Sequence, residues 1–63
     1  MKTFKVFGKV HSKLSSAEHA QVFWVYANDK DHAVDRAIQQ LECWYKLDWD
    51  IHPHDIEVVE QTQ

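Results

Sequence analysis

The stretch "QVFWVYAND", residues 21–29, decides the fold. A strand that covers one core in a small protein alternates apolar and polar side chains, because successive side chains point to opposite faces of the sheet. Here residues 22–26 are apolar on both faces, whereas Asn28 and Asp29, which follow, are residue types typical of a helix start. The stretch therefore predicts a strand that leads directly into a helix, and something must cover the second face of that strand.

Two further segments flank this stretch with clear periodicity. Residues 2–11 alternate, which predicts a first strand with one apolar face and one basic face. After the second strand, at 19–27, apolar residues recur at spacings of three and four and predict a helix capped by Asn28 or Asp29. The apolar stripe of this helix consists of Val34, Ala37, Ile38, Leu41 and either Trp44 or Tyr45.

The C-terminal part of the chain predicts a loop followed by a third strand. In "DWDIHPHD", residues 48–55, Pro53 cannot donate to a strand ladder and restrains His52, so we expect a loop or an irregular extended piece. Residues 55–61 predict the last strand. With short connections, these elements predict a two-layer α+β domain of ββαβ type, with a three-stranded sheet in order 2-1-3 and the helix packed on one face.

Length and composition limit the class of protein. The 63 residues make one domain, 1–63, with a thin core and marginal stability, for which a partner or a second copy would compensate. The single cysteine, Cys43, excludes an internal disulfide and is expected to be a small apolar residue at the edge of the helix stripe. No signal peptide or membrane-spanning run is visible, so we expect a cytoplasmic protein with no membrane contact.

Charge is unevenly distributed along the chain. Residues 1–16 carry four lysines and no acid, whereas residues 17–63 carry ten acids against Lys30, Arg36 and Lys46. This asymmetry is compatible with a charged partner surface, or with strand lysines that keep a sheet edge soluble.

The second strand also predicts a binding surface. The chain turns into the helix at its end, which favours Phe23, Val25 and Ala27 as the face under the helix. The opposite face then carries large apolar side chains that no other element covers, and such a patch typically marks an interface with a second copy or a host protein. The predicted interface residues are Phe7, Val22, Trp24, Tyr26 and Val59. In the competing interpretation, Trp49 and Ile51 fold back over this face as a lid.

Acidic residues provide a second candidate surface. Asp48, Asp50, Asp55, Glu57 and Glu60 could form a negative surface that competes for a basic groove on a nucleic-acid-binding target. Solvated acids without a binding role are the alternative interpretation.

Other chemistries have weaker support in the sequence. Phe7, Trp24 and Tyr26 beside Lys5 and Lys9 could stack nucleic-acid bases, which is the alternative function, although the glycine and aromatic signature of RNA-binding sheets is absent. His52 and His54 offer metal donors, but Pro53 between them is expected to turn their rings apart, so no metal or cofactor is predicted. With one glycine and no nucleophile motif, we expect no enzyme activity.

Three segments together carry a family resemblance. The opening "MKTFKVFGKV", the strand that flows through "VYANDKDHAVDRAIQ" into a helix, and the closing "DIEVVEQ" resemble the strand-strand-helix-strand pattern of small proteins of phages and mobile elements, including DpnD-like and some anti-CRISPR proteins. The resemblance implies a non-catalytic inhibitor or accessory factor that binds a host protein complex, blocks its substrate and acts in the host cytoplasm. It carries over no site residue, because those families share no functional motif.

Overall fold

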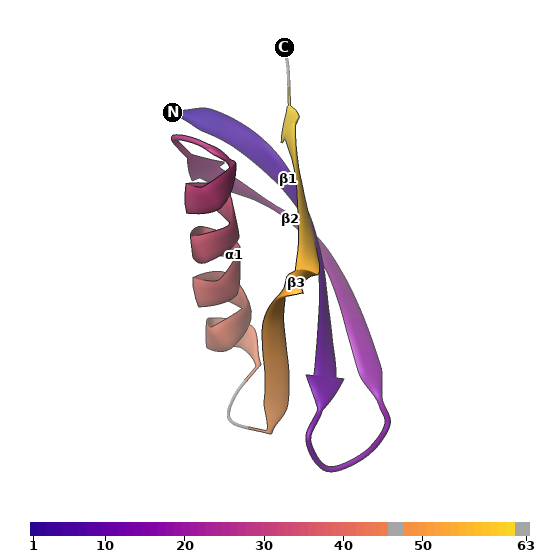
Figure 1. Ribbon diagram of the computed structural model, residues 1–63. Helices are drawn as coiled ribbons and strands as arrows, with labels where there is room; N and C mark the ends of the chain where they lie inside the picture. The colour runs from indigo at the N-terminus through magenta and orange to yellow at the C-terminus, as the bar shows by residue number, and fades with distance from the viewer. Residues whose placement is uncertain (46–47, 62–63) are drawn as a thin grey trace.

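The computed structural model describes residues 1–45 and 48–61, which form three strands and one helix. The elements follow in the order β1 (Lys2–Ser12), β2 (Glu18–Ala27), α1 (Lys30–Trp44) and β3 (Trp49–Gln61). Both neighbours of the central strand β1 pair with it antiparallel, in the order β2-β1-β3, and α1 covers one face of the sheet (Figure 1). The predicted α+β fold and strand order are therefore confirmed. Within the described residues, no helix is long and apolar enough to cross a membrane.

Helix α1 begins where the sequence predicts and buries a slightly different stripe. Asp29 is the N-cap, and its Oδ1 accepts a hydrogen bond of 2.9 Å from the backbone N–H of His32. The fully buried residues are Ala33, Ala37 and Leu41, so the line nearest the sheet is one of small residues with one leucine. Ala33 was not predicted in this stripe, and Cys43, expected at its edge, is exposed.

The core lies between α1 and the inner face of the sheet. Phe23, Val25 and Ala27 of β2 are buried, so the predicted split of this strand is confirmed. The other buried apolar residues are Phe4, Val6, Val10, Ala33, Ala37, Leu41 and Val58. The helix approaches β1 closely at Gly8, where a Cβ atom would stand 3.0 Å from Cδ1 of Leu41.

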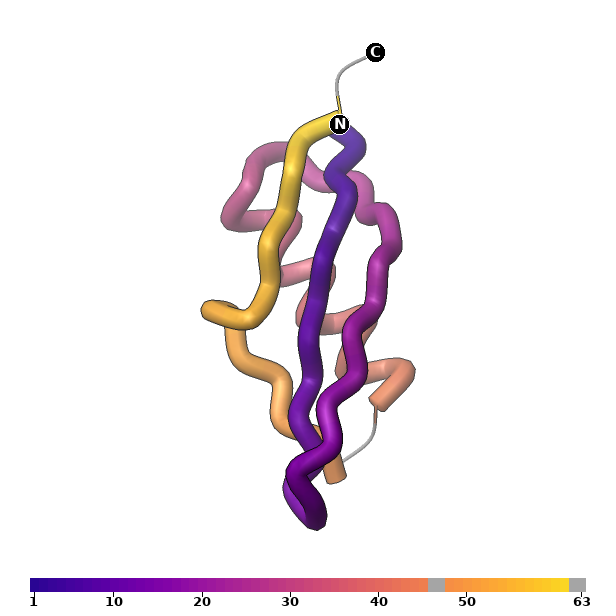
Figure 2. The backbone as a smooth tube through the Cα atoms, turned by 90° about the vertical axis from the view of Figure 1, so that its right-hand side faces the viewer, coloured from indigo at the N-terminus to yellow at the C-terminus, as the bar shows by residue number. Residues whose placement is uncertain are grey.

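Strand β3 corrects the prediction for the C-terminal part. It begins at Trp49 rather than near residue 55, because Trp49–Ile51 pair with the end of β1 before the segment with Pro53. Between the pairs Gly8↔Ile56 and Val10↔Ile51, residues 52–55 stand opposite Lys9 alone. This wide bulge projects from the sheet edge (Figure 2) and places Pro53 where no ladder hydrogen bond is needed.

The bulge also decides which face receives Trp49 and Ile51. Ile51 and Ile56 are five residues apart, so in a regular strand they would point to opposite faces. The extra residues of the bulge restore the alternation, and Trp49, Ile51 and Ile56 all pack against the core on the helix side. The prediction of a lid over the outer face is therefore wrong, because Trp49 and Ile51, which would form it, pack against the core on the inner face.

Candidate binding face

The sheet face turned away from α1, called the outer face below, brings the predicted interface residues together. In the strand register, Lys5 stands between Trp24 and Val59. Phe7, next along the same face of β1, stands between Val22 and Glu57. Tyr26 extends this grid by one row, opposite Thr3. The five residues Phe7, Val22, Trp24, Tyr26 and Val59 therefore form one contiguous surface, called the aromatic patch.

Exposure distinguishes the aromatic patch from ordinary surface. Its members retain 40% (Phe7), 50% (Val22), 57% (Trp24), 64% (Tyr26) and 42% (Val59) of their accessible area. Single exposed apolar residues are normal on any protein, but these five come from three strands and adjoin one another. The structure thus presents apolar side chains of three strands to solvent, grouped around Lys5.

One cation stands within the aromatic patch. Nζ of Lys5 lies 5.3 Å from the ring centroid of Phe7 and 5.6 Å from that of Trp24. Both distances are within the range of cation–π attraction. The lysine therefore lies along the apolar side chains and holds its charge over their rings.

The other end of the outer face is polar and internally paired. Nε2 of His11 lies 3.0 Å from Oδ2 of Asp55, and Nδ1 of the same ring lies 3.6 Å from Oε1 of Glu18. Glu18 also approaches Lys9 Nζ at 3.7 Å, and His54 approaches Asp55 at 3.6 Å. These pairs join all three strands, so the bulge of β3 is tied to the hairpin of β1 and β2 by side chains as well as by the sheet.

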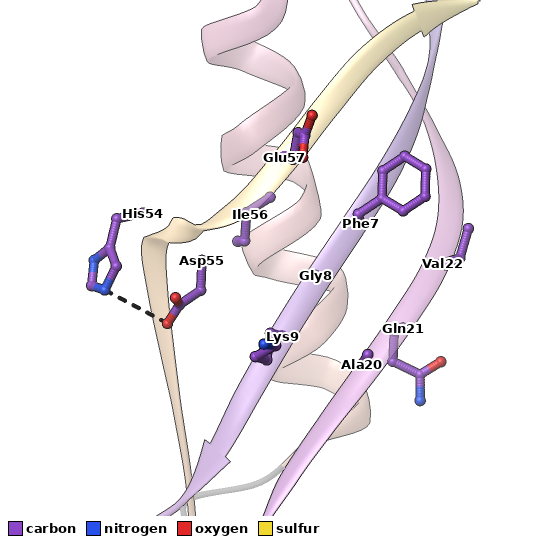
Figure 3. A pocket seen from close by; sticks show the side chains of 10 residues that line it. All are labelled: Phe7, Gly8, Lys9, Ala20, Gln21, Val22, His54, Asp55, Ile56 and Glu57. Atoms are coloured by element: carbon purple, nitrogen blue, oxygen red, sulfur yellow. Dashed lines mark ion pairs between the residues drawn. The ribbon is translucent and has the colours of Figure 1, made fainter.

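A hollow of about 310 Å³ lies between the two ends of the outer face. It is lined by residues 7–9 of β1, 20–22 of β2 and 54–57 of β3 (Figure 3). One rim carries the apolar Phe7 and Val22, and the other carries Lys9, Asp55 and His54, where the dashed line joins His54 to Asp55. The hollow therefore has space for an apolar side chain of a partner, next to polar groups.

The acidic candidates do not form one free negative surface. Asp50 pairs with Lys13 at 3.6 Å and Glu60 pairs with Lys2 at 3.6 Å. Asp55 contacts His11 and His54, as described above. Among the ion pairs between described residues, none includes Glu57. Their role in target binding stays a prediction.

The histidines of the bulge correct one geometric prediction. The rings of His52 and His54 are stacked, with centroids 5.2 Å apart and planes inclined by 19°, because the bulge bends the backbone between them. Pro53 therefore does not turn them apart. Among residues 1–45 and 48–61, no group of three or more His, Cys, Asp or Glu side chains is placed to hold a metal ion.

Two features of the surface were missed by sequence reasoning. The pair of His11 and Asp55 depends on the register of the bulge, which no sequence pattern announces. Trp44 is half exposed and its ring centroid lies 5.0 Å from that of Phe23, at the side of β2.

Comparison of the chain with protein-family models, with curated proteins and with solved structures gave no match.

Proposed function

We propose that this protein is a small non-catalytic binding protein that acts as a homodimer and docks a host protein through its aromatic patch. The observation that carries the proposal is the patch itself: five adjoining apolar side chains that face solvent on a domain with one thin core. Leaving such a surface in water is costly, and a partner that covers it recovers roughly 25 cal/mol for each Å² of apolar area.

The residue types of the aromatic patch suit a protein partner. Tryptophan and tyrosine bring large, rigid contact area with a polar tip, which is why they are enriched among the residues that dominate interface energies. Trp24 and Tyr26 supply both here. Lys5 adds a positive charge, and its aliphatic chain already lies along apolar side chains of the patch. The Lys5 side chain therefore needs little rearrangement when a partner binds.

The ion pairs favour the aromatic patch over the acidic residues as the main docking site. Asp50, Asp55 and Glu60 each have a basic partner within this chain. A target would have to replace those contacts before gaining new ones, although surface pairs of this kind are individually weak. The acids fit better as a polar rim that sets orientation and association rate.

The inhibitor class extends this proposal. The chain resembles small phage and mobile-element proteins in its element order, and on that basis the docked protein would be a host complex of the anti-CRISPR or other anti-defence kind whose substrate is blocked. The protein would then act in the host cytoplasm. The support for this extension is the pattern of the sequence.

Nucleic acid is the second candidate ligand for the same patch. Lys5 beside Phe7 and Trp24 resembles the combination of cation and stacking rings that single-stranded nucleic acids use. The net charge of −3 opposes it, because the phosphate backbone rewards a basic surface. A gel shift with single-stranded DNA and RNA at low salt tests it directly, and a shift that weakens as salt rises would replace the protein partner with nucleic acid.

Capture from a nuclease-treated lysate of the source cells tests the docking proposal. Immobilised wild-type protein should retain a defined partner, and Trp24→Ala should lose at least about 90% of it, since removal of a central anchor commonly costs 2 kcal/mol or more. Leu14→Ala is the matched control, because Leu14 is 80% exposed and lies outside the patch. Equal capture by both variants with unchanged circular dichroism would refute the role of the patch.

A further inference from the structure

The two edges of the sheet differ in how they are protected. The edge strand β3 carries Pro53, a four-residue bulge and several acids, all of which are devices that discourage pairing with another strand. The edge strand β2, Glu18–Ala27, has ten residues in regular register with β1, no proline, no lysine and no bulge. Only one of the two edges is therefore suited to accept a further strand.

Exposed apolar side chains lie on both sides of the β2 edge. Val22, Trp24 and Tyr26 project from it on the outer face. On the helix side, the half-exposed ring of Trp44 stands edge-on against Phe23. The aromatic patch does not account for Trp44, because this residue belongs to the opposite layer of the domain. A partner at the β2 edge would contact both layers together.

A hollow of about 430 Å³ runs beside the same edge. It lies between Trp24–Tyr26 of β2 and the side of α1 that carries Arg36, Gln39 and Cys43. An added strand would place alternate side chains above and below the sheet, and those on the helix side would enter this space.

We propose that β2 pairs antiparallel with β2 of a second copy of this chain, across a two-fold axis at Phe23. Directly opposite side chains of two paired strands point to the same face of the sheet. In β2 the even-numbered residues lie on the outer face and the odd-numbered ones on the inner face, so the residue numbers of each opposite pair must add up to an even number. With Phe23 opposite Phe23 of the second copy, the two numbers of every opposite pair add up to 46. It places Val22 opposite the second copy's Trp24, and Ala20 opposite its Tyr26.

This register is favoured by shape and charge. Each large side chain of the outer face meets a small one, and Glu18 stands opposite Asn28 at the end of the ladder rather than opposite an apolar or acidic residue. The pair of Trp24 and Val22 is of the aromatic and β-branched type that stabilises neighbouring strands, whereas a shift that centres on Val22 would put Glu18 opposite Tyr26. The chosen register also brings Trp44, through its contact with Phe23, to the symmetry axis.

The dimer would be a continuous six-stranded sheet with both helices on one side. The two aromatic patches would adjoin on the other side and would stay open for a target. This inference deepens the proposed homodimer and rests on it, and it moves the dimer contact from the outer face, where the sequence places it, to the β2 edge.

Amide hydrogen exchange followed by NMR tests the edge pairing on the unmodified protein. In a monomer, only the β2 amides that point toward β1 are protected, so alternate residues of 19–27 exchange rapidly. Edge pairing protects the other set as well, by about 15-fold once the total protein concentration is about 100 times the dimer dissociation constant, because about 7% of the chains then remain monomeric. The protection should disappear on dilution, in step with a fall from about twice the 7.5 kDa chain mass to the monomer mass in light scattering.

Cysteine cross-linking tests the register. In a Cys43→Ser background, equal amounts of a Val22→Cys chain and a Trp24→Cys chain are mixed and oxidised, and the mixed disulfide is counted by intact mass. The control mixes Ala20→Cys with Trp24→Cys, a pair whose numbers sum to 44. The inference expects at least a fivefold excess of mixed disulfide for the first pair, and equal yields would overturn the register.

The outcomes separate the two proposals. A dimer in which alternate β2 amides still exchange rapidly would overturn the edge pairing and leave the proposed homodimer standing, with the outer face as its contact. A protein that stays monomeric at millimolar concentration would overturn both. Protection of all β2 amides that persists in Trp44→Gln at every concentration tested would show that Trp44 does not contribute to the contact, and would overturn its place at the axis.

Discussion

The two faces of one sheet are built from the same residue types and serve different purposes. Val58 is 7% exposed under the helix, while its neighbour Val59 is 42% exposed in the aromatic patch. Phe23 and Trp24 make the same contrast on the opposite edge strand, β2, where they are 8% and 57% exposed. Hydrophobicity alone thus does not assign a residue to the core. In this molecule the register of three strands and the position of a single helix decide which apolar residues stabilise the fold and which are left for a partner.

The sharpest test of this contrast is Leu41→Ala. Leu41 is fully buried between α1 and the sheet, so its truncation leaves a cavity and should lower the free energy of unfolding by about 2–5 kcal/mol. A domain of this size has little more stability than that, so much of the population should unfold. Leu14→Ala, at a residue 80% exposed, should change the free energy by less than about 0.5 kcal/mol.

Urea denaturation followed by circular dichroism measures both leucine variants. One protein concentration must be used throughout, because dimerisation couples apparent stability to concentration. Equal losses for Leu41 and Leu14 would contradict the assignment of the core to the inner face.

The valine pair makes the comparison between faces with a single chemical change. Val58→Ala should cost roughly 2 kcal/mol, from about 0.8 kcal/mol per buried methylene group plus incomplete relaxation of the cavity. Val59→Ala should cost less than about 0.5 kcal/mol and should weaken partner capture instead. Thermal unfolding of the two variants side by side checks this, and a reversed order would mean that the register of β3 is offset by one residue.

Much of this contrast could be predicted from the sequence. The period of two divides the apolar residues of β2 into two sets, and the turn of the chain into the helix favoured Phe23, Val25 and Ala27 as the core set, which the structure confirms. Val22, Trp24 and Tyr26 were then left outside. Residue type also predicted the N-cap at Asn28 or Asp29, and the structure has it at Asp29.

The part that could not be predicted is concentrated in residues 48–55. Pro53 indicated a break in pairing, which is correct locally, but the chain bulges and then resumes its ladder rather than leaving the sheet. The odd spacing between Ile51 and Ile56 conceals that both lie on the core side. The contacts of the bulge with His11 depend on that three-dimensional path, so no periodicity could reveal them.

A smaller effect is expected where the inner face is tightest. Gly8→Ala introduces a methyl group 3.0 Å from Cδ1 of Leu41, and relief requires that side chain to move, so we expect a loss of about 1 kcal/mol. In the double variant with Leu41→Ala, the methyl group enters the space that the leucine vacates. The combined loss should therefore be smaller than the sum of the two single losses, which a double-mutant cycle by urea denaturation measures. Strict additivity would show that Gly8 and Leu41 do not contact.

The smallest effect is expected on the outer face, at Lys5. Replacing Lys5 by Gln removes the cation held over Phe7 and Trp24 but keeps much of the stem, so the free energy of unfolding should fall by at most about 0.5–1 kcal/mol. Phe7→Leu keeps the patch apolar and removes one of the two rings, and a double-mutant cycle of the two substitutions should give a coupling of about 0.5 kcal/mol. A coupling above about 2 kcal/mol would mean that Lys5 is desolvated in the free protein, and that the outer face is covered before any partner binds. A coupling near the expected value would mean that, in the free protein, the outer face is exposed to solvent while the inner face is buried under the helix.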